Sequence, residues 1–131
     1  MIVLDTHVMI WWVNDPAQLS MPAHAAIAKA MDTKSVYVSC ISSWEIALLA
    51  DRGRLKLAID VRDWLARCEA IPFLTFVPVN TFIAVESVRL PDFPHADPAD
   101  RIITATAMSL GAQLVTKDER IRSYTYLKTV W

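Results

Sequence analysis

Short apolar runs alternate with longer stretches of helical pattern along the chain, and this alternation constrains the fold more than any other feature. It is typical of strand–helix–strand units, in which helices cover a parallel sheet. We therefore predict an α/β fold: a three-layer α/β/α sandwich with a mostly parallel sheet of about five strands. A single domain over residues 1–131 is expected. The expected strands are residues 2–4, 36–38, 73–77, 114–116 and 127–130.

Polar residues that can cap helices precede several of the helical stretches. A side-chain oxygen at such a position accepts a hydrogen bond from a free N–H group of the first turn. The capping candidates are Ser20, Asp60, Asn80 and Asp97. Gly111 follows the last long stretch, where a left-handed helix end requires glycine. The expected helices are residues 7–13, 20–30, 42–52, 60–68, 80–88 and 97–110.

The two glycines and the charge balance exclude several classes of function. Gly53 and Gly111 lie far apart, so the chain contains neither a P-loop nor the glycine-rich turn of a dinucleotide-binding site. The 13 basic and 14 acidic side chains give a formal charge of −1, which argues against a simple basic coat for nucleic acid. The 54% share of hydrophobic residues excludes a disordered chain. Because no glycine-rich loop is present, any phosphate chemistry must use other groups to bind the phosphate.

The cysteines and the apolar segments point to an intracellular protein outside the membrane. Cys40 and Cys68 show neither metal-ligand spacing nor a disulfide pattern, and Cys40 lies in a run, residues 35–41, that we interpret as a buried strand. The N-terminus has no basic segment of the kind that begins a signal peptide. The longest uncharged stretch, residues 70–85, contains prolines and is shorter than the roughly 18–20 apolar residues of a membrane span. We expect a cytoplasmic protein with reduced cysteines.

Four acidic residues occupy similar positions in the predicted fold, each next to the end of a strand or the start of a helix. Asp5 follows the first expected strand, and Asp118 follows the fourth. Glu45 and Asp100 lie in the first turns of the helices expected over residues 42–52 and 97–110. Because strand carboxyl ends and the adjacent helix starts line one crevice of an open α/β sheet, we expect the four side chains to converge there.

Four carboxylates in one crevice repel one another and raise one another's pKa. A hard divalent cation such as Mg²⁺ or Mn²⁺ resolves this repulsion, because these ions prefer carboxylate oxygens. Such an ion also makes water more acidic and neutralises charge that develops on a phosphoryl oxygen. The cluster therefore indicates a metal centre for phosphoryl chemistry.

A purely structural role is open for three of the acids. Ser42 and Glu45 match a capping box with Ser42 as the N-cap, and Asp100 lies where the helix dipole favours an acid. Asp118 can cap the turn that follows it. Asp5 differs, because a carboxylate directly after three apolar strand residues has no evident helix to cap and needs a partner. Taken singly, each of the other acids is more often a cap, but the four together favour a site.

Four motifs occur in order along the chain: VLDTH at residues 3–7, SSWEIA at 42–47, DPADRIITATA at 97–107 and LVTKD at 114–118. Together they resemble the ordered motifs of PIN-domain proteins, and among these the VapC-like toxins of bacterial type II toxin–antitoxin pairs. Any single motif is weak evidence, and the resemblance rests on all four in a chain of 131 residues. It implies an endoribonuclease that depends on Mg²⁺ or Mn²⁺ and acts as the toxin of such a pair.

The resemblance also implies roles for individual residues. The family's acidic quartet, which binds the metal and carries catalysis, is matched by Asp5, Glu45, Asp100 and Asp118. Asp5 and Asp100 resemble the principal metal ligands, and the other two would complete the site directly or through water. Thr6 and Thr116 match hydroxyl positions that orient the acids. The roles of His7, Asp97 and Arg101 stay open between chemistry and local structure, as does the number of metal ions.

Members of this family usually form homodimers and are held inactive by an antitoxin protein, also in higher assemblies. Two apolar stretches, residues 9–12 and 23–31, fit exposed anchors for such partners. The alternative is that the tryptophans are core residues, which we expect for at least three of the five. RNA phosphates could be held by basic residues that flank the acidic motifs, or these residues form an ordinary solvated face. They are Arg52, Arg54, Lys56, Lys117, Arg120 and Arg122.

Three rival functions remain. A phosphatase with Asp5 as its nucleophile would carry a second acid two residues later, where His7 stands. A phospho-accepting receiver domain would need an acidic pair after its first strand, and only Asp5 is present there. The third rival is a catalytically silent PIN-fold module that binds proteins. All four acids are present, which favours the ribonuclease, and the sequence leaves its RNA substrate open.

Overall fold

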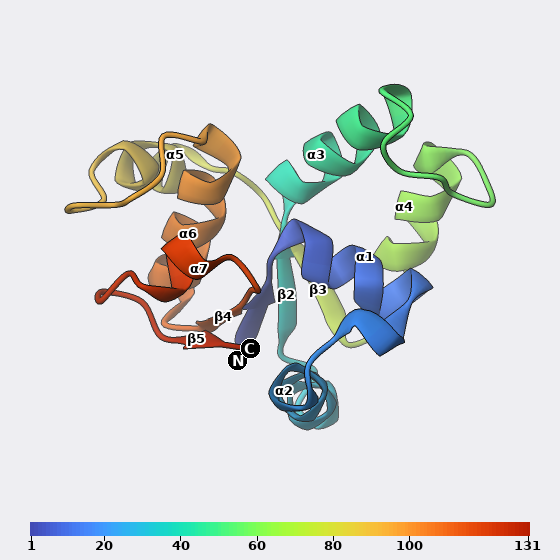
Figure 1. Cartoon of the computed structure of the whole chain (residues 1–131), viewed down its shortest axis with the longest axis horizontal. Coiled ribbons are helices and arrows are strands. Elements are labelled where there is room, and N and C mark those ends of the chain that lie inside the picture. Colours follow the sequence, from blue (N-terminus) through green and yellow to red (C-terminus); the bar gives the residue numbers. More distant parts are fainter.

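A computed structural model describes all 131 residues and contains one five-stranded sheet in which every neighbouring pair is parallel (Figure 1). The strand order is β3-β2-β1-β4-β5, so the first strand lies in the centre. The predicted parallel α/β fold is confirmed, and strand boundaries differ from the prediction by one or two residues. The strands are β1 (Ile2–Leu4), β2 (Val36–Ser39), β3 (Leu74–Val77), β4 (Gln113–Val115) and β5 (Thr129–Val130).

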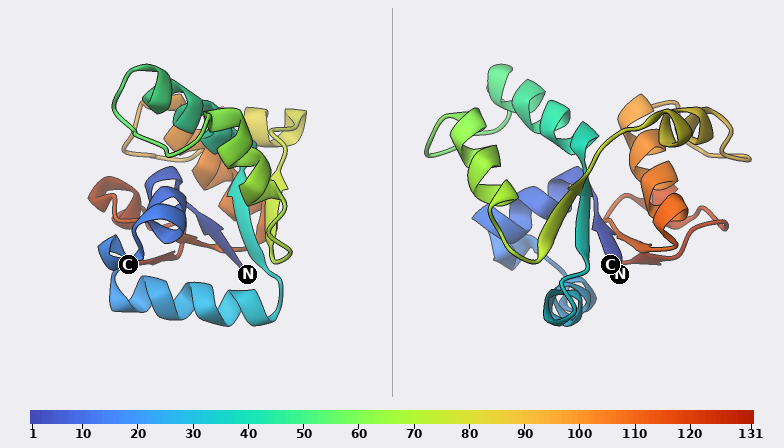
Figure 2. Two further views of the ribbon diagram at one scale, coloured as in Figure 1. Left: turned by 90° about the vertical axis from the view of Figure 1, so that its right-hand side faces the viewer. Right: turned by 180° about the vertical axis from the view of Figure 1, so that it is seen from behind.

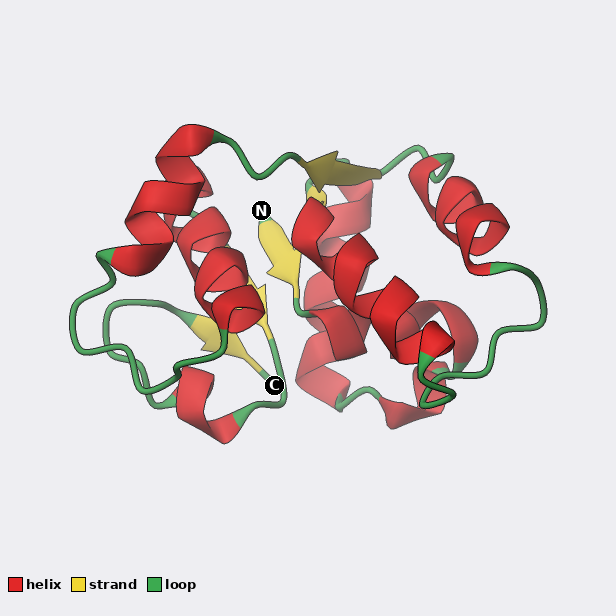
Figure 3. Ribbon diagram, turned by 90° about the horizontal axis from the view of Figure 1, so that it is seen from above, coloured by secondary structure: helices red, strands yellow, loops and turns green.

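Helices cover both faces of the sheet and complete the three layers (Figure 2). One face carries α1 (Thr6–Asn14), α2 (Met21–Asp32), α3 (Cys40–Asp51) and α4 (Val61–Glu69). The other carries α5 (Thr81–Val88), α6 (Pro98–Leu110) and α7 (Glu119–Arg122), and a short 3₁₀ helix, η1 (Pro16–Gln18), joins α1 to α2. Seen from above, the helices form two groups on either side of the central strands (Figure 3).

The two faces of the sheet build two separate hydrophobic clusters. Successive strand residues point to opposite faces, so Ile2 and Leu4 join one cluster while Val3 joins the other. All three are buried, as expected for a parallel strand covered by helices on both sides. Packing on both faces therefore fixes the position of β1 and of Asp5, the residue that follows it.

Most of the predicted helix ends are confirmed. Ser20 accepts a hydrogen bond from Ala23 N at 3.2 Å, and Asn80 accepts one from Ile83 N at 2.9 Å. Asp60 and Asp97 cap α4 and α6 in the same way. Gly111 ends α6 with φ +63°, in the left-handed region that glycine adopts without strain.

Two helix starts differ from the prediction. The helix α3 begins at Cys40, immediately after β2, because Ser39 caps it by accepting a hydrogen bond from Ile41 N at 3.2 Å. The predicted capping box of Ser42 and Glu45 is therefore wrong, and so is the strand assigned to Cys40. Asp5 does cap a helix: α1 begins at Thr6, one residue earlier than expected, and Thr6 N donates to the Asp5 carboxylate.

The apolar stretches expected to be exposed are core segments. Met9 and Ile10 are buried, and Trp11 and Trp12 pack half-buried against the first cluster. On α2, Ala23, Ile27 and Ala30 turn inward, whereas Ala25 and Ala28 are exposed. Of the five tryptophans, Trp64 is buried in the core, Trp11, Trp12 and Trp131 pack against it half-buried, and Trp44 is largely exposed, at 58%. Both cysteines are free, and no helix is sufficiently long and apolar to span a membrane.

Candidate metal centre

The carboxyl edge of the sheet forms an open pocket of about 400 Å³ that all four predicted acids line. Asp5 and Asp118 arrive from the ends of β1 and β4, which are neighbours in the sheet, and Asp100 comes from the first turn of α6. Glu45 comes from the second turn of α3 rather than the first. The structure thus brings together residues from four distant parts of the chain, as the strand–helix pattern predicts.

Asp5 is the most buried of the four, with 8% of its surface exposed. One carboxylate oxygen accepts a hydrogen bond from Thr6 N at 2.8 Å, and the other accepts one from Thr116 Oγ1 at 2.7 Å. Burial nevertheless raises the pKa of the Asp5 carboxyl, because these two hydrogen bonds only partly replace the lost water. The predicted orienting role of Thr116 agrees with this contact.

Glu45 is held by two hydroxyl groups in series, which we call the hydroxyl relay: Ser42 Oγ, Thr6 Oγ1 and Glu45 Oε1. Thr6 Oγ1 donates to Glu45 at 2.5 Å, so its own oxygen accepts from the buried Ser42 hydroxyl at 2.8 Å. Burial raises the pKa of Glu45, and the nearby charges of Asp5 and Asp97 raise it further. Ser42 therefore supports the site instead of capping α3.

Asp100 is a partly buried acid surrounded by other carboxylates. Burial raises the pKa of its carboxyl to about 7, and the charges of Asp5 and Asp97 add to the effect. Only two ion pairs occur in the structure and both involve His95, so no lysine or arginine is paired with any of the four acids. The pocket is thus a cluster of carboxylates in which His95 is the one basic side chain paired with the acids.

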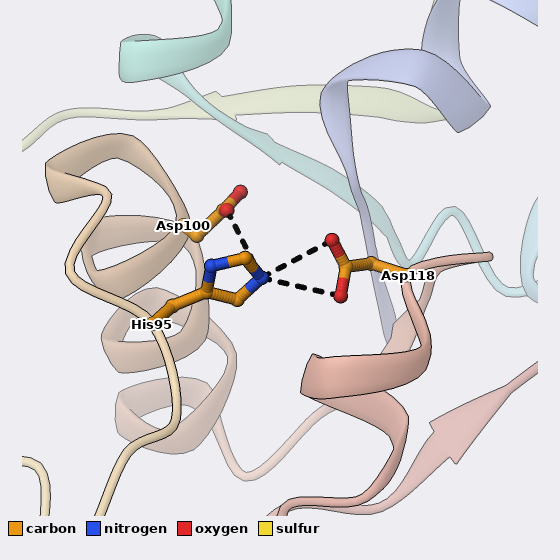
Figure 4. Close-up of side chains that lie close together, drawn as sticks. All are labelled: His95, Asp100 and Asp118. Carbon is orange, nitrogen blue, oxygen red and sulfur yellow. Dashed lines mark hydrogen bonds and ion pairs between the residues drawn. The ribbon is translucent and has the colours of Figure 1, made fainter.

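Asp118 is different, because its carboxylate is well satisfied. It caps α7, where Oδ1 accepts from Arg120 N at 2.9 Å and from Ile121 N at 3.1 Å. His95 Nε2 lies 3.2 Å from both Asp118 oxygens and 3.6 Å from Asp100 Oδ2 (Figure 4). Burial acts to raise the pKa of Asp118, but the hydrogen bonds from Ile121 N and His95 outweigh it, and the pKa lies below its ordinary value.

His95 is a site residue that the sequence reasoning missed. It lies in an irregular, proline-containing loop, and neither periodicity nor ligand spacing marks it. The one available signal is that His95 lies two residues before Asp97, the N-cap of α6. Because α6 begins at the site, residues close to its N-cap in sequence also lie near the site.

Other residues singled out in the sequence occupy simpler positions. His7 and Lys117 line the pocket and are exposed. Arg101 forms no ion pair with an acid and does not lie free on the surface. It is half-buried, donates to His95 O at 2.9 Å and to Ser87 O at 3.0 Å, and stacks over Phe93 at 5.5 Å. Its role is therefore to hold the loop that carries His95.

The donor set fits a hard divalent cation. Carboxylate oxygens from four residues face one pocket, and burial, with the charges of neighbouring acids, raises the pKa values of Asp5, Glu45 and Asp100, so their negative charge is poorly compensated. A divalent cation would supply that charge and favours these ligands over others. His95, Asp100 and Asp118 also place potential ligand atoms within 4.8 Å of one another.

Comparison with known proteins agrees with this geometry. The sequence profile described as PIN domain matches residues 2–125. Ribonuclease VapC22 of Mycobacterium tuberculosis (strain ATCC 25618 / H37Rv) is 41% identical over 132 residues, spanning 99% of this chain and 98% of that protein.

Solved structures show the same fold at low sequence identity. One similar structure is VapBC2 from Rickettsia felis bound to a DNA fragment from its promoter. Its TM-score is 0.71 at 15% identity, over 98% of this chain and 97% of that chain. A toxin–antitoxin complex from Klebsiella pneumoniae gives a TM-score of 0.61 and 19% identity, over 95% of this chain and 92% of that chain.

Fold and site together define an α/β protein with an acidic centre at the carboxyl edge of a parallel sheet. The chain belongs to the PIN-domain family. The resemblance found in its four motifs is confirmed, because the family match runs through all of them and the VapC relative spans nearly the whole chain.

Proposed function

We propose that this PIN-domain protein is an endoribonuclease that depends on Mg²⁺ or Mn²⁺ and acts as the toxin of a type II toxin–antitoxin pair. The observation that carries the proposal is the convergence of four carboxylates in one open pocket without a paired lysine or arginine. The 41% identical relative named as a ribonuclease supports RNA as the substrate.

Asp5 and Asp100 are the principal metal ligands in this proposal, and Glu45 and Asp118 complete the site directly or through water. When bound, the ion acts as a Lewis acid that makes water more acidic and offsets charge on a phosphoryl oxygen. All four acids are catalytic residues in this sense.

The protein's own groups fix the orientation of these carboxylates. Thr116 holds one oxygen of Asp5, and the hydroxyl relay holds one oxygen of Glu45. Because each carboxylate oxygen has a second lone pair, these hydrogen bonds orient the ligands without using up their capacity to bind a cation. Lys117, exposed at the pocket, is positioned to attract an RNA phosphate.

We further propose that the chain forms a homodimer and that a cognate antitoxin protein keeps it inactive in a toxin–antitoxin assembly. The similarity to a structure that is a toxin–antitoxin complex supports the antitoxin. Phe82, Val85 and Val88 of α5 are exposed, and a homodimer would remove apolar surface of this kind from water. The two free cysteines suit action in the reducing cytoplasm.

The test is RNA cleavage by the purified protein. It should cut RNA with Mg²⁺ or Mn²⁺ and stop when a chelator is added. Asp5→Asn and Asp100→Asn should each lose most of the rate, whereas Asp63→Asn, an exposed acid on α4, should keep it. Full activity of Asp100→Asn would contradict the assignment, and a wild-type protein without any cleavage would favour the silent protein-binding module. Mapping new RNA 5′ ends after brief expression identifies the substrate.

The dimer is tested by light scattering on the purified chain. A mass of two chains is expected at micromolar concentration. A monomer under these conditions would refute the homodimer and leave the nuclease assignment untouched.

A further inference from the structure

The side chain of His95 is fixed at the pocket by its own small network. Its backbone oxygen accepts a hydrogen bond from Arg101 Nε at 2.9 Å, and its ring packs on Phe93 with centroids 6.1 Å apart. Phe93 in turn packs edge-on against Tyr124, whose hydroxyl donates to Pro91 O at 2.7 Å. Only 11% of the His95 side chain is exposed. The imidazole is therefore held in place by packing and hydrogen bonds on several sides.

This network places His95 Nε2 between two of the proposed ligands (Figure 4). The nitrogen lies 3.2 Å from each of the two Asp118 carboxylate oxygens and 3.6 Å from Asp100 Oδ2. One potential ligand atom from each of the three residues lies within 4.8 Å of the other two. Donor atoms that share one ion are separated by no more than about twice the metal–ligand distance, roughly 4–5 Å. A cation bound by Asp100 and Asp118 therefore lies within reach of Nε2 when the imidazole carries its proton on Nδ1, so that Nε2 offers a lone pair to the ion in place of its hydrogen bond to Asp118.

We propose that His95 is a direct nitrogen ligand of the divalent cation, together with Asp100 and Asp118. This inference rests on the proposed metal site and specifies its ligands and its ion preference. Mg²⁺ strongly prefers oxygen donors, whereas transition metals accept imidazole nitrogen more readily. The site consequently favours Mn²⁺ over Mg²⁺.

Pulsed electron paramagnetic resonance of the Mn²⁺-loaded full chain tests the ligand directly. Nitrogen bound to Mn²⁺ modulates the electron spin echo, and labelling the histidines with ¹⁵N changes the coupling. The chain has three histidines, so His7→Gln and His24→Gln serve as matched controls. The coupling should survive in both controls and vanish in His95→Gln. Absence of nitrogen coupling in the wild type, or its persistence in His95→Gln, overturns the proposal.

The relative affinity for Mn²⁺ and Mg²⁺ separates a ligand from a residue that only positions Asp118, because loss of a positioning residue also weakens metal binding but does so for both ions alike. The Gln amide in His95→Gln can still donate a hydrogen bond to Asp118 but has no nitrogen lone pair for a metal. Calorimetric titration should show at least a roughly 10-fold loss of Mn²⁺ affinity in this variant, with a smaller change for Mg²⁺. Unchanged Mn²⁺ affinity, or equal losses for both ions, overturns the inference.

The outcomes are independent of folding and of nuclease activity. Isotope labelling of the wild-type protein needs no variant, so a misfolded His95→Gln does not remove the test. RNA cleavage without histidine coupling refutes this inference alone. Histidine coupling in a protein that cuts no RNA refutes the proposed nuclease and leaves the ligand set standing.

Discussion

Asp100→Asn should make the metal-free protein more stable while it abolishes RNA cleavage. The pKa of the Asp100 carboxyl is raised from 3.8 to about 7, first by burial and then by the charges of Asp5 and Asp97. At pH 8 the Asp100 carboxyl is therefore ionised in both states, but its charge is less favourable in the folded protein than in the unfolded chain. Asparagine has nearly the same shape and carries no charge, so it removes this cost.

The size of the effect follows from the pKa. A rise from 3.8 to about 7 corresponds to on the order of 4 kcal/mol between the two protonation states. Solvent screening reduces this value little, because only 19% of the Asp100 side chain is exposed. A raised pKa in the folded state means that proton binding stabilises the fold fully below about pH 4 and that this stabilisation is lost as the pH rises towards 7. The variant should therefore match the wild type at pH 4 and exceed it at pH 8.

Urea unfolding in the presence of a chelator, at pH 4 and at pH 8, measures the difference. Asp118→Asn is the matched control: the pKa of Asp118 is lowered, so loss of its charge should destabilise the protein at pH 8. Mn²⁺ should narrow the gap between wild type and Asp100→Asn, because it binds the wild type more tightly. The reasoning fails if Asp100→Asn is no more stable than the wild type at pH 8, or if its advantage is the same at both pH values.

Two further substitutions test how the carboxylates are held. Thr116→Val removes a buried hydroxyl that donates to the Asp5 carboxylate and accepts from Asp118 N, and it should lower the free energy of unfolding by at least about 1.5–3 kcal/mol. Thr104→Val, at an equally buried hydroxyl without a partner, should be neutral or stabilising in the same urea titration. Equal losses in the two would refute the role of the hydrogen bond. Ser42→Ala breaks the hydroxyl relay and should lower the free energy of unfolding by about 0.5–1.5 kcal/mol and reduce RNA cleavage through Glu45. The neighbouring substitution Ser43→Ala should change neither quantity. Equal cleavage activities of the two variants would contradict the relay.

The parts of the fold that sequence reasoning predicted are those that local patterns specify. A buried strand such as Ile2–Leu4 is a continuous apolar run, and Asn80 or Gly111 marks a helix end by its own chemistry. The convergence of the four acids followed from topology, since the carboxyl ends of parallel strands share an edge. These predictions needed no knowledge of side-chain contacts.

The wrong predictions concern side chains whose exposure and partners are determined by contacts between segments far apart in the sequence. Whether Trp11 is exposed depends on Trp131 and Lys117, which approach it from the far end of the chain. Ser42 resembles an N-cap locally, but its hydroxyl contacts Thr6, 36 positions away in sequence. His95 acquires its place through Arg101 and the aromatic residues of its loop. No periodicity encodes such pairs, because each depends on the completed fold.

The capping role of the acids and the metal-binding role that we propose for them, which the sequence presents as alternatives, are compatible in the structure. Asp5 caps α1, Asp118 caps α7, and Asp97 caps α6 directly before Asp100. Backbone N–H groups at a helix start stabilise a carboxylate without bringing in a second charged side chain. Had lysine or arginine held these acids instead, a cation would have had to displace the basic group before it could bind. Helix starts therefore allow the protein to fold around clustered carboxylates and still leave their charge available to a divalent ion.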